Sequence, residues 1–326
     1  MTTPVSPSIA LLASERLIRV SGAQARNFLH GQLSQNMDDV TPSQALRAAA
    51  CTPKGRAYGL LLVARDGDDF ILRCPVSVLD PLLHTLNKYR PLFRGTTMDV
   101  EPAAEVYGLL GDAAAQTLTA NPADQFTHWG TTLAVAGGLL IRVPDTAEGL
   151  RRYEFWRLQP DIELPAPFTQ HLGAHPEAWA NSEIAAGIAT LTPDTLESYV
   201  PQMLNWQHLQ GVHFKKGCYT GQEIIARMHF LGQLKKSLYR LTSEAPHAPI
   251  SAGTPVTRGE TILGEVVNCC PLADGRLALL AVLRHDQASA PLYLPGQSTP
   301  LQLQPLPYTV PEQQPATPPD VDATDT

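Results

Sequence analysis

Basic residues and long apolar runs are scarce in this sequence, and each shortage excludes a class of protein. The 326 residues hold 24 Lys and Arg against 31 Asp and Glu, a formal charge of −7. This balance argues against broad, non-specific nucleic-acid binding. No apolar run reaches the ~18 residues of a membrane-spanning helix, so we expect no membrane association. The first residues lack a basic stretch before their short apolar segment, so no secretory signal is expected.

Cysteine is also scarce, and its pattern is not that of a metal site. The chain has five cysteines, with no CxxC pair and no His/Cys cluster at zinc spacing, so no metal site is predicted. An odd, sparse set in a long chain is typical of reduced thiols in the cytoplasm. We therefore expect a cytoplasmic protein without a disulfide framework. Cys51, Cys74, Cys269 and Cys270 are expected to pack within strands.

Proline, by contrast, is abundant, with 29 residues, and hydrophobic residues make up 44% of the chain. The length exceeds the ~150 residues of one average domain, so we expect two or three domains. The segment from Pro305 to Thr326 holds six Pro, four acidic residues and no Lys or Arg. Such a segment buries too little apolar surface to offset its ordering entropy, so we predict a disordered tail over residues 306–326.

The apolar pattern predicts an α+β chain with an all-β C-terminal domain. Up to about residue 234, strand patterns alternate with helices expected at 23–35, 76–89 and 177–187, and a hairpin is expected at 66–69. From residue 235 to 305, short strands are separated by Gly, Pro and Asp turns, which favours a small β-barrel or sandwich. These strands are expected at 237–241, 254–258, 262–268, 277–283, 291–294 and 301–304.

The stretch from residue 213 to 223, HFKKGCYTGQE, carries the clearest chemistry. Thr220 and Glu223 have the spacing of a capping box that leads into an apolar-periodic helix. Cys218 would then lie just before a helix N-terminus and close to two lysines, and both features lower the pKa of a thiol. We predict a reactive Cys218 thiol activated by Lys216. The alternative is an inert, buried cysteine.

Charge is unevenly distributed around this stretch. Residues 215–240 hold six basic residues and one acid, a sum of +5, so the other 300 residues sum to −12. The excess marks either a solvated surface or a pocket for a small polyanionic ligand.

The residues Lys216–Glu223, KGCYTGQE, resemble the signature of the YgfZ family. These proteins are folate-binding relatives of the glycine cleavage T protein, linked to iron–sulfur cluster assembly or repair. Segments 20–33, 51–56 and 201–214 agree, and the resemblance covers about residues 8–305. It implies three modules around a central channel, two of them ferredoxin-like and the third a C-terminal β-barrel. Residues 1–234 would be the folate-binding region, with an inserted module at about 48–104.

The resemblance also implies tetrahydrofolate as the ligand of the channel. Trp179, in a Trp-x-x-x-x-Ile-x-x-Gly segment, is the candidate that stacks on the pterin, and its alternative is a core tryptophan. On the second strand, where some members of the family carry an aromatic residue, this chain has Glu15. The other candidate ligand contacts are Arg227, Gln222, Glu223 and Asn205.

Two functions of different classes follow from the resemblance. The first is a folate-dependent accessory factor for iron–sulfur proteins, with Cys218 as its functional thiol and an indirect effect on tRNA modification. The alternative is a one-carbon enzyme, such as an aminomethyltransferase or demethylase. The stretch that matches the T protein's acidic position, Gly55–Gly59, holds no acid, which favours the accessory factor over a classical enzyme. We expect a monomer that binds folate and iron–sulfur client or assembly proteins, without direct nucleic-acid contact.

Overall fold

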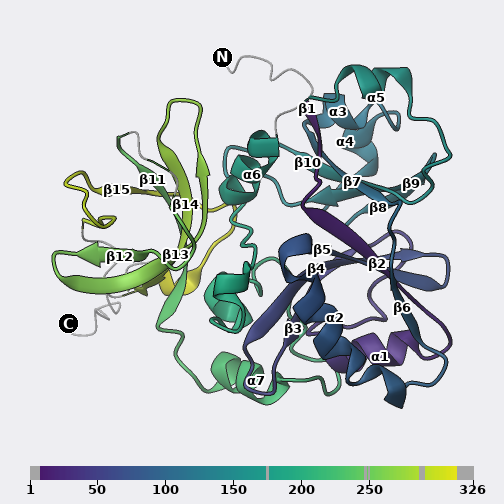
Figure 1. Cartoon of the computed structure of the whole chain (residues 1–326), viewed down its shortest axis with the longest axis horizontal. Helices are drawn as coiled ribbons and strands as arrows, with labels where there is room; N and C mark the ends of the chain where they lie inside the picture. Colours follow the sequence, from purple (N-terminus) through teal and green to yellow (C-terminus); the bar gives the residue numbers. More distant parts are fainter. Residues whose placement is uncertain (1–7, 174–175, 246–247, 249, 286–290, 314–326) are drawn as a thin grey trace, which may run out of the picture.

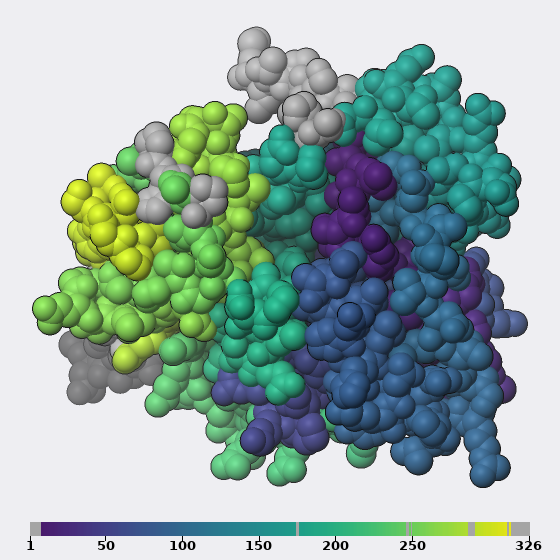
Figure 2. All heavy atoms as spheres, viewed as in Figure 1, coloured from purple at the N-terminus to yellow at the C-terminus, as the bar shows by residue number. Residues whose placement is uncertain are grey.

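Antiparallel sheets form most of the structure, and helices pack on and between them (Figure 1). The computed structural model describes residues 8–173, 176–245, 248, 250–285 and 291–313. This part of the chain holds three sheets of five strands each. Figure 2 shows the same three regions as atoms, packed against one another.

The first sheet comes from the N-terminal region and has the strand order β3-β4-β5-β2-β6. The predicted hairpin at residues 66–69 is confirmed, with Gly67 at φ 60° in the turn between β4 and β5. Two helices cover one face of the sheet and bury Phe28, Leu82 and Leu86 completely. The elements are β2 (Glu15–Ser21), α1 (Ala25–Gln32), β3 (Leu46–Cys51), β4 (Ala57–Asp66), β5 (Asp69–Pro75), η1 (Val76–Val78), α2 (Leu79–Asn87), η2 (Arg90–Leu92) and β6 (Thr97–Val100).

Residues 48–104 supply most of this sheet, but β2, which precedes them in the chain, pairs with both β5 and β6. The range predicted as an inserted module therefore shares its sheet with an earlier strand. The domain limits stay a prediction.

The second sheet has the order β1-β7-β10-β9-β8 and packs face to face against the first. Leu17 and Ile71 of the first sheet join Ile141 and Trp156 of the second in one buried cluster. Short helices cover the other face. The elements are β1 (Ser8–Leu11), β7 (Glu105–Leu110), α3 (Asp112–Ala115), α4 (Pro122–Gln125), β8 (Thr132–Val135), β9 (Gly138–Val143), β10 (Arg152–Arg157) and α5 (Ala166–Gln170).

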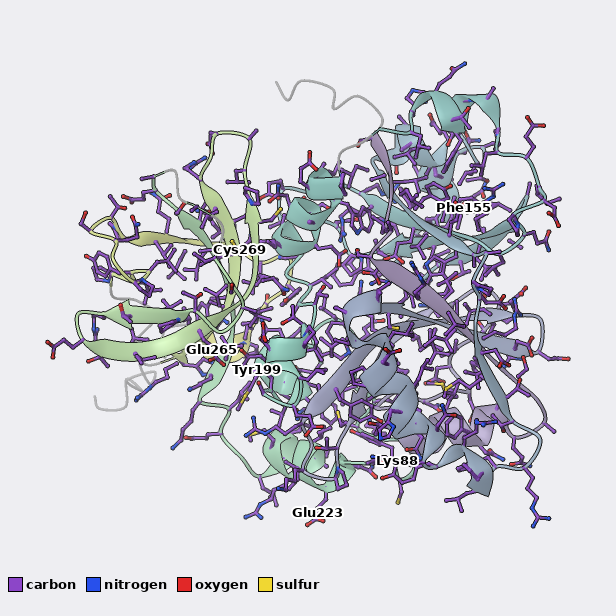
Figure 3. The ribbon with its side chains drawn as sticks, viewed as in Figure 1. Lys88, Phe155, Tyr199, Glu223, Glu265 and Cys269 are labelled. Carbon is purple, nitrogen blue, oxygen red and sulfur yellow. The ribbon has the colours of Figure 1, made fainter. Side chains whose placement is uncertain are left out.

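A connecting segment lies between these sheets and the C-terminal sheet (Figure 1). It contains α6 (Pro176–Ala185), η3 (Pro193–Thr195), η4 (Pro201–Leu204) and α7 (Gln222–Phe230). The hydroxyl of Tyr199 donates a 2.7 Å hydrogen bond to Glu265, which ties the segment to the C-terminal sheet (Figure 3).

The C-terminal sheet, β12-β13-β14-β11-β15, is curled into a half-barrel. Residues 292 and 293 form isolated bridges to β15 and β12, so they link the two edge strands. The predicted strand at 291–294 is thus reduced to single bridges. The elements are β11 (Lys236–Ser243), β12 (Pro255–Arg258), β13 (Thr261–Pro271), β14 (Leu277–Arg284), β15 (Leu301–Gln304) and η6 (Pro311–Gln313).

Part of the predicted disordered tail is ordered. The hydroxyl of Tyr308 donates to the Gly187 carbonyl at 2.7 Å, and Val310 is buried. The Gln313 amide donates to the Leu238 carbonyl at 2.9 Å. The prediction was wrong for residues 306–313, because these apolar and hydrogen-bonding contacts hold them on the fold. Residues 314–326 lie outside the described part of the chain.

Candidate functional site

A cavity of about 490 Å³ lies where all three sheets meet. Leu11 of β1, Glu15 of β2 and Cys269 of β13 each contribute to its wall, and α6 forms another side. Cys269 lies on the part of the C-terminal sheet that faces α6 (Figure 3). The volume falls within the ~300–1,000 Å³ typical of small-molecule sites.

Trp179 of α6 both lines this cavity and belongs to the core, so it combines the two alternatives raised by the sequence. Its side chain is only 5% exposed. The ring packs directly on Gly108 of β7, where a Cβ atom would lie 2.3 Å from Trp179 Cε3. The guanidinium of Arg152 lies 4.2 Å from the ring centroid, a cation–π distance. These contacts fix the indole at the cavity wall.

A buried network of charges adjoins Trp179 through Arg152. Arg73 lies 3.0 Å from the Glu15 carboxylate and 3.2 Å from that of Glu154, and Arg152 pairs with Glu183. Glu183 follows Trp179 by four residues, so both lie on one face of α6 and line the cavity. Sequence reasoning missed Glu183, although this helical spacing was a usable signal.

The two carboxylates of the cavity differ in ionisation. Burial raises the pKa of Glu15 from 4.5 to about 7, although Arg73 works in the opposite direction. Burial also disfavours the ionised form of Glu183, but Arg152, Arg73 and Arg47 outweigh it and hold the Glu183 pKa below its usual value. Near neutral pH the Glu183 carboxylate is therefore ionised, whereas the Glu15 carboxyl is only partly ionised.

The signature loop is anchored by Lys216, which is buried. Its ammonium group donates to the backbone carbonyls of His30, Leu33 and Gln35, the last two at 2.7 and 2.9 Å. Since an ammonium has three hydrogens, all are engaged at the end of α1. Its activation of the Cys218 thiol stays a prediction, and these contacts give the ammonium a different set of partners.

Two glycines explain how the signature meets the β3–β4 turn. Gly221 has φ 85°, and a Cβ on it would lie 2.5 Å from the Thr52 carbonyl oxygen. Gly55 has φ 71°, and a Cβ there would lie 2.9 Å from Ile224. Both positions thus need glycine for conformation and for close approach. Two segments that carry the family resemblance are therefore in direct contact.

The predicted capping box was wrong. Helix α7 begins at Gln222 with Gly221 as its N-cap and without a side-chain cap. The Thr220 amide donates instead to the Gly31 carbonyl at 3.1 Å, which holds this residue against α1. Cys218 consequently lies three residues before the N-cap, and its side chain is exposed.

Of the predicted ligand contacts, only Trp179 lines the cavity. Asn205 is fully buried and donates a 2.9 Å hydrogen bond to the Leu238 carbonyl, so it joins the connecting segment to β11. The other three belong to α7, at the opposite end of the connecting segment, and Figure 3 places Glu223 at the edge of the molecule. Their position in the signature, or in the case of Arg227 just after it, does not bring them to Trp179. These three are Gln222, Glu223 and Arg227.

Asn268 also lines the cavity, and the sequence did not indicate it. Its side chain accepts a hydrogen bond from the Thr190 amide and donates one to the Thr190 carbonyl, both at 2.9 Å. These two hydrogen bonds fix the cavity wall where the connecting segment passes β13.

The described residues contain neither a metal-binding cluster nor a membrane-spanning helix. Within these ranges, no group of three or more His, Cys, Asp or Glu side chains is arranged to hold a metal ion. No helix among them has the length and apolar character needed to cross a membrane.

Comparison with known proteins tests the resemblance to the YgfZ family. No family model matches this chain. A protein named tRNA-modifying protein YgfZ from an Escherichia coli strain is 29% identical over 315 residues. A protein of the same name from Shigella dysenteriae serotype 1 is 29% identical over 311 residues. Each alignment covers 91% of this chain and 91% of the relative. The resemblance to the YgfZ family is confirmed.

The fold of this chain is shared with an enzyme of known structure. The crystal structure of glycine cleavage system aminomethyltransferase T from Bartonella henselae matches with a TM-score of 0.71. The match covers 94% of this chain and 87% of that one, at 16% sequence identity, and so shows the fold alone. The mixed α+β class is confirmed, while the division into three modules stays a prediction.

Proposed function

We propose that this chain is a tetrahydrofolate-binding accessory factor for the assembly or repair of iron–sulfur proteins. It supports tRNA modification indirectly, and Cys218 is its functional thiol. The observation that carries the proposal is the cavity at Trp179, formed by all three sheets of a T-protein-like fold in a chain with the YgfZ signature.

The residues of the cavity fit the planar part of a folate. The indole of Trp179 and the side chains of Ile184 and Ile188 supply an apolar, partly aromatic wall. Glu15 and Glu183 supply acceptors for the N–H groups of a pterin ring. Tetrahydrofolate, when bound, supplies a carrier for one-carbon groups.

Cys218 is the thiol best placed for chemistry with a partner. It is exposed, whereas Cys51, Cys74 and Cys270 are buried. Burial raises the pKa of Cys74 to about 12 and that of Cys270 to about 11, which keeps these thiols protonated. A cluster usually needs about four ligands, so Cys218 would contact a client's sulfur or cluster transiently.

Glu15 favours a second candidate, a folate-dependent one-carbon enzyme. A carboxyl with a pKa of about 7 inside the cavity is suited to general acid–base catalysis near neutral pH. Under this alternative, purified protein with tetrahydrofolate converts a methylated amine catalytically, and Glu15→Gln abolishes turnover. The accessory factor requires no such turnover.

The experiment uses a strain that lacks the gene and measures thiolated nucleosides in its tRNA. We expect wild type to restore them and Cys218→Ala to leave them at the level of the deletion strain. Cys74→Ala, which removes a buried thiol, is the matched control and should restore them. Full restoration by a Cys218→Ala protein would contradict the role of this thiol.

A further inference from the structure

An exposed apolar pair stands at the C-terminal end of α7. Phe230 is 64% exposed and Leu231 is 84% exposed. The pair adjoins an aromatic cluster in which Phe214 stacks on His229, with ring centroids 3.6 Å apart, and His229 lies 4.7 Å from Phe230. Contiguous apolar side chains in water mark interaction sites when polar groups surround them.

Cations surround this pair. Lys215, Arg227, Lys235 and Lys236 are exposed, and none of these four has an ion-pair partner among the described residues. An open hollow of about 830 Å³ beside them is lined by residues 232–236 together with Arg284 and His285. Figure 1 places α7 at the lower edge of the molecule. We call these residues, 214–218 and 227–236, the α7 surface.

We infer that the α7 surface binds an acidic segment of a partner protein that carries a large apolar side chain. The inference rests on the proposed function, since Cys218 is exposed on the same loop, four residues after Phe214. A segment seated on Phe230 and Leu231 would bring its protein to this thiol. Charge complementarity selects the acidic character, because four of the six basic residues in 215–240 are exposed on this surface, namely Lys215, Arg227, Lys235 and Lys236.

A protein fits this surface better than RNA or the chain's own C-terminus. The 300 residues outside 215–240 carry a net charge of −12, and this charge repels the phosphates of an extended nucleic acid. Residues 314–326 contain Val321 as their only large apolar side chain, too little to cover Phe230 and Leu231.

The test combines a variant with a cross-link, both in the full chain. Leu231→Ser/Lys235→Glu/Lys236→Glu should lower the restored thiolated nucleosides about tenfold, the size expected when an interface core is lost. Its tetrahydrofolate affinity should match wild type. The matched control is Leu92→Ser/Lys88→Glu, which alters another exposed apolar residue (76%) and a nearby exposed lysine, and it should restore the nucleosides fully.

The probe is a photoreactive p-benzoylphenylalanine at position 231, irradiated in cells. We expect a cross-link to an acidic peptide of an iron–sulfur protein, lost in Lys235→Glu/Lys236→Glu. A cross-link to RNA or to a second copy of the chain, no cross-link, or full restoration by the triple variant overturns the inference. If Cys218→Ala also restores the nucleosides, the proposed function has failed. If the triple variant restores the nucleosides and Cys218→Ala does not, only the inference about the α7 surface is wrong.

Discussion

Lys216 was predicted from the sequence to activate the Cys218 thiol. In the structure its buried ammonium group anchors the signature loop. The last carbonyls of a helix lack partners within the helix, and a lysine near that end can satisfy them. Lys216 does so for the end of α1, 186 residues away from His30 in sequence. Burial, followed by the nearby charge of Arg26, lowers its pKa to about 7. The sequence placed this lysine beside Cys218 but could not show which way its side chain points.

Replacing Lys216 with Met should destabilise the fold. The change removes the donor of three carbonyls, two of them buried, so we expect the free energy of unfolding to fall by about 3 kcal/mol, measured by urea denaturation. Lys215→Met, at the exposed neighbour, should change it by less than ~0.5 kcal/mol. If Lys216→Met unfolds like wild type but slows alkylation of Cys218, the lysine acts on the thiol instead.

Glu15 makes stability depend on pH in a definite direction. Its pKa is raised from 4.5 to about 7, so the folded protein keeps a proton that the unfolded chain releases. The free energy of unfolding contributed by Glu15 therefore falls as pH rises through this window. Glu15→Gln resembles the protonated state and lacks this loss.

We expect the free energy of unfolding of Glu15→Gln, taken relative to wild type, to be about 2 kcal/mol higher at pH 8 than at pH 5. One unit of pKa shift corresponds to ~1.4 kcal/mol. Urea denaturation of both proteins at the two pH values measures this difference. A constant difference across the window would show that the carboxyl is ionised throughout.

Strand patterns predicted the elements well, while helix termini were predicted less well. Alternation and turn residues placed the β4–β5 hairpin and most strands of the C-terminal sheet, because these signals are local. The helix expected at 23–35 ends at Gln32, because the Leu33 backbone turns extended and bridges to Ala50. The capping box failed for a similar reason, since Thr220 is held by α1. Contacts with distant segments therefore set where α1 ends and where α7 begins.

The packing of α6 on β7 depends on the absence of a side chain at Gly108. In Gly108→Ala the new Cβ would lie 2.3 Å from Trp179 Cε3, so the ring must move into the cavity. We expect a loss of about 1–3 kcal/mol in stability, and weaker tetrahydrofolate binding by calorimetry. Gly31→Ala is the control, because its Cβ would meet nothing closer than 3.9 Å. Wild-type affinity in Gly108→Ala would argue that the ring's position is irrelevant to the ligand.

The assembly of the cavity was beyond sequence reasoning, although its key tryptophan was not. Its walls come from residues 11–15, 176–190 and 268–270, which lie far apart in the chain. The family resemblance indicated a T-protein-like fold and selected Trp179. It could not indicate Glu183 or Asn268 as cavity residues, nor separate Asn205 and the α7 residues from the cavity. Those distinctions depend on how the three sheets meet.

The proposal that the Trp179 cavity binds folate is tested most directly by titrating the protein with tetrahydrofolate in a calorimeter. Trp179→Ala removes the indole, and Ala180→Trp fills the cavity from an exposed position of α6 without disturbing the core. Trp129→Ala removes a half-buried tryptophan that does not line the cavity. We expect affinity to fall at least about tenfold in the first two variants and to stay at the wild-type value in the third. Unchanged affinity in both Trp179→Ala and Ala180→Trp would contradict folate binding at this cavity.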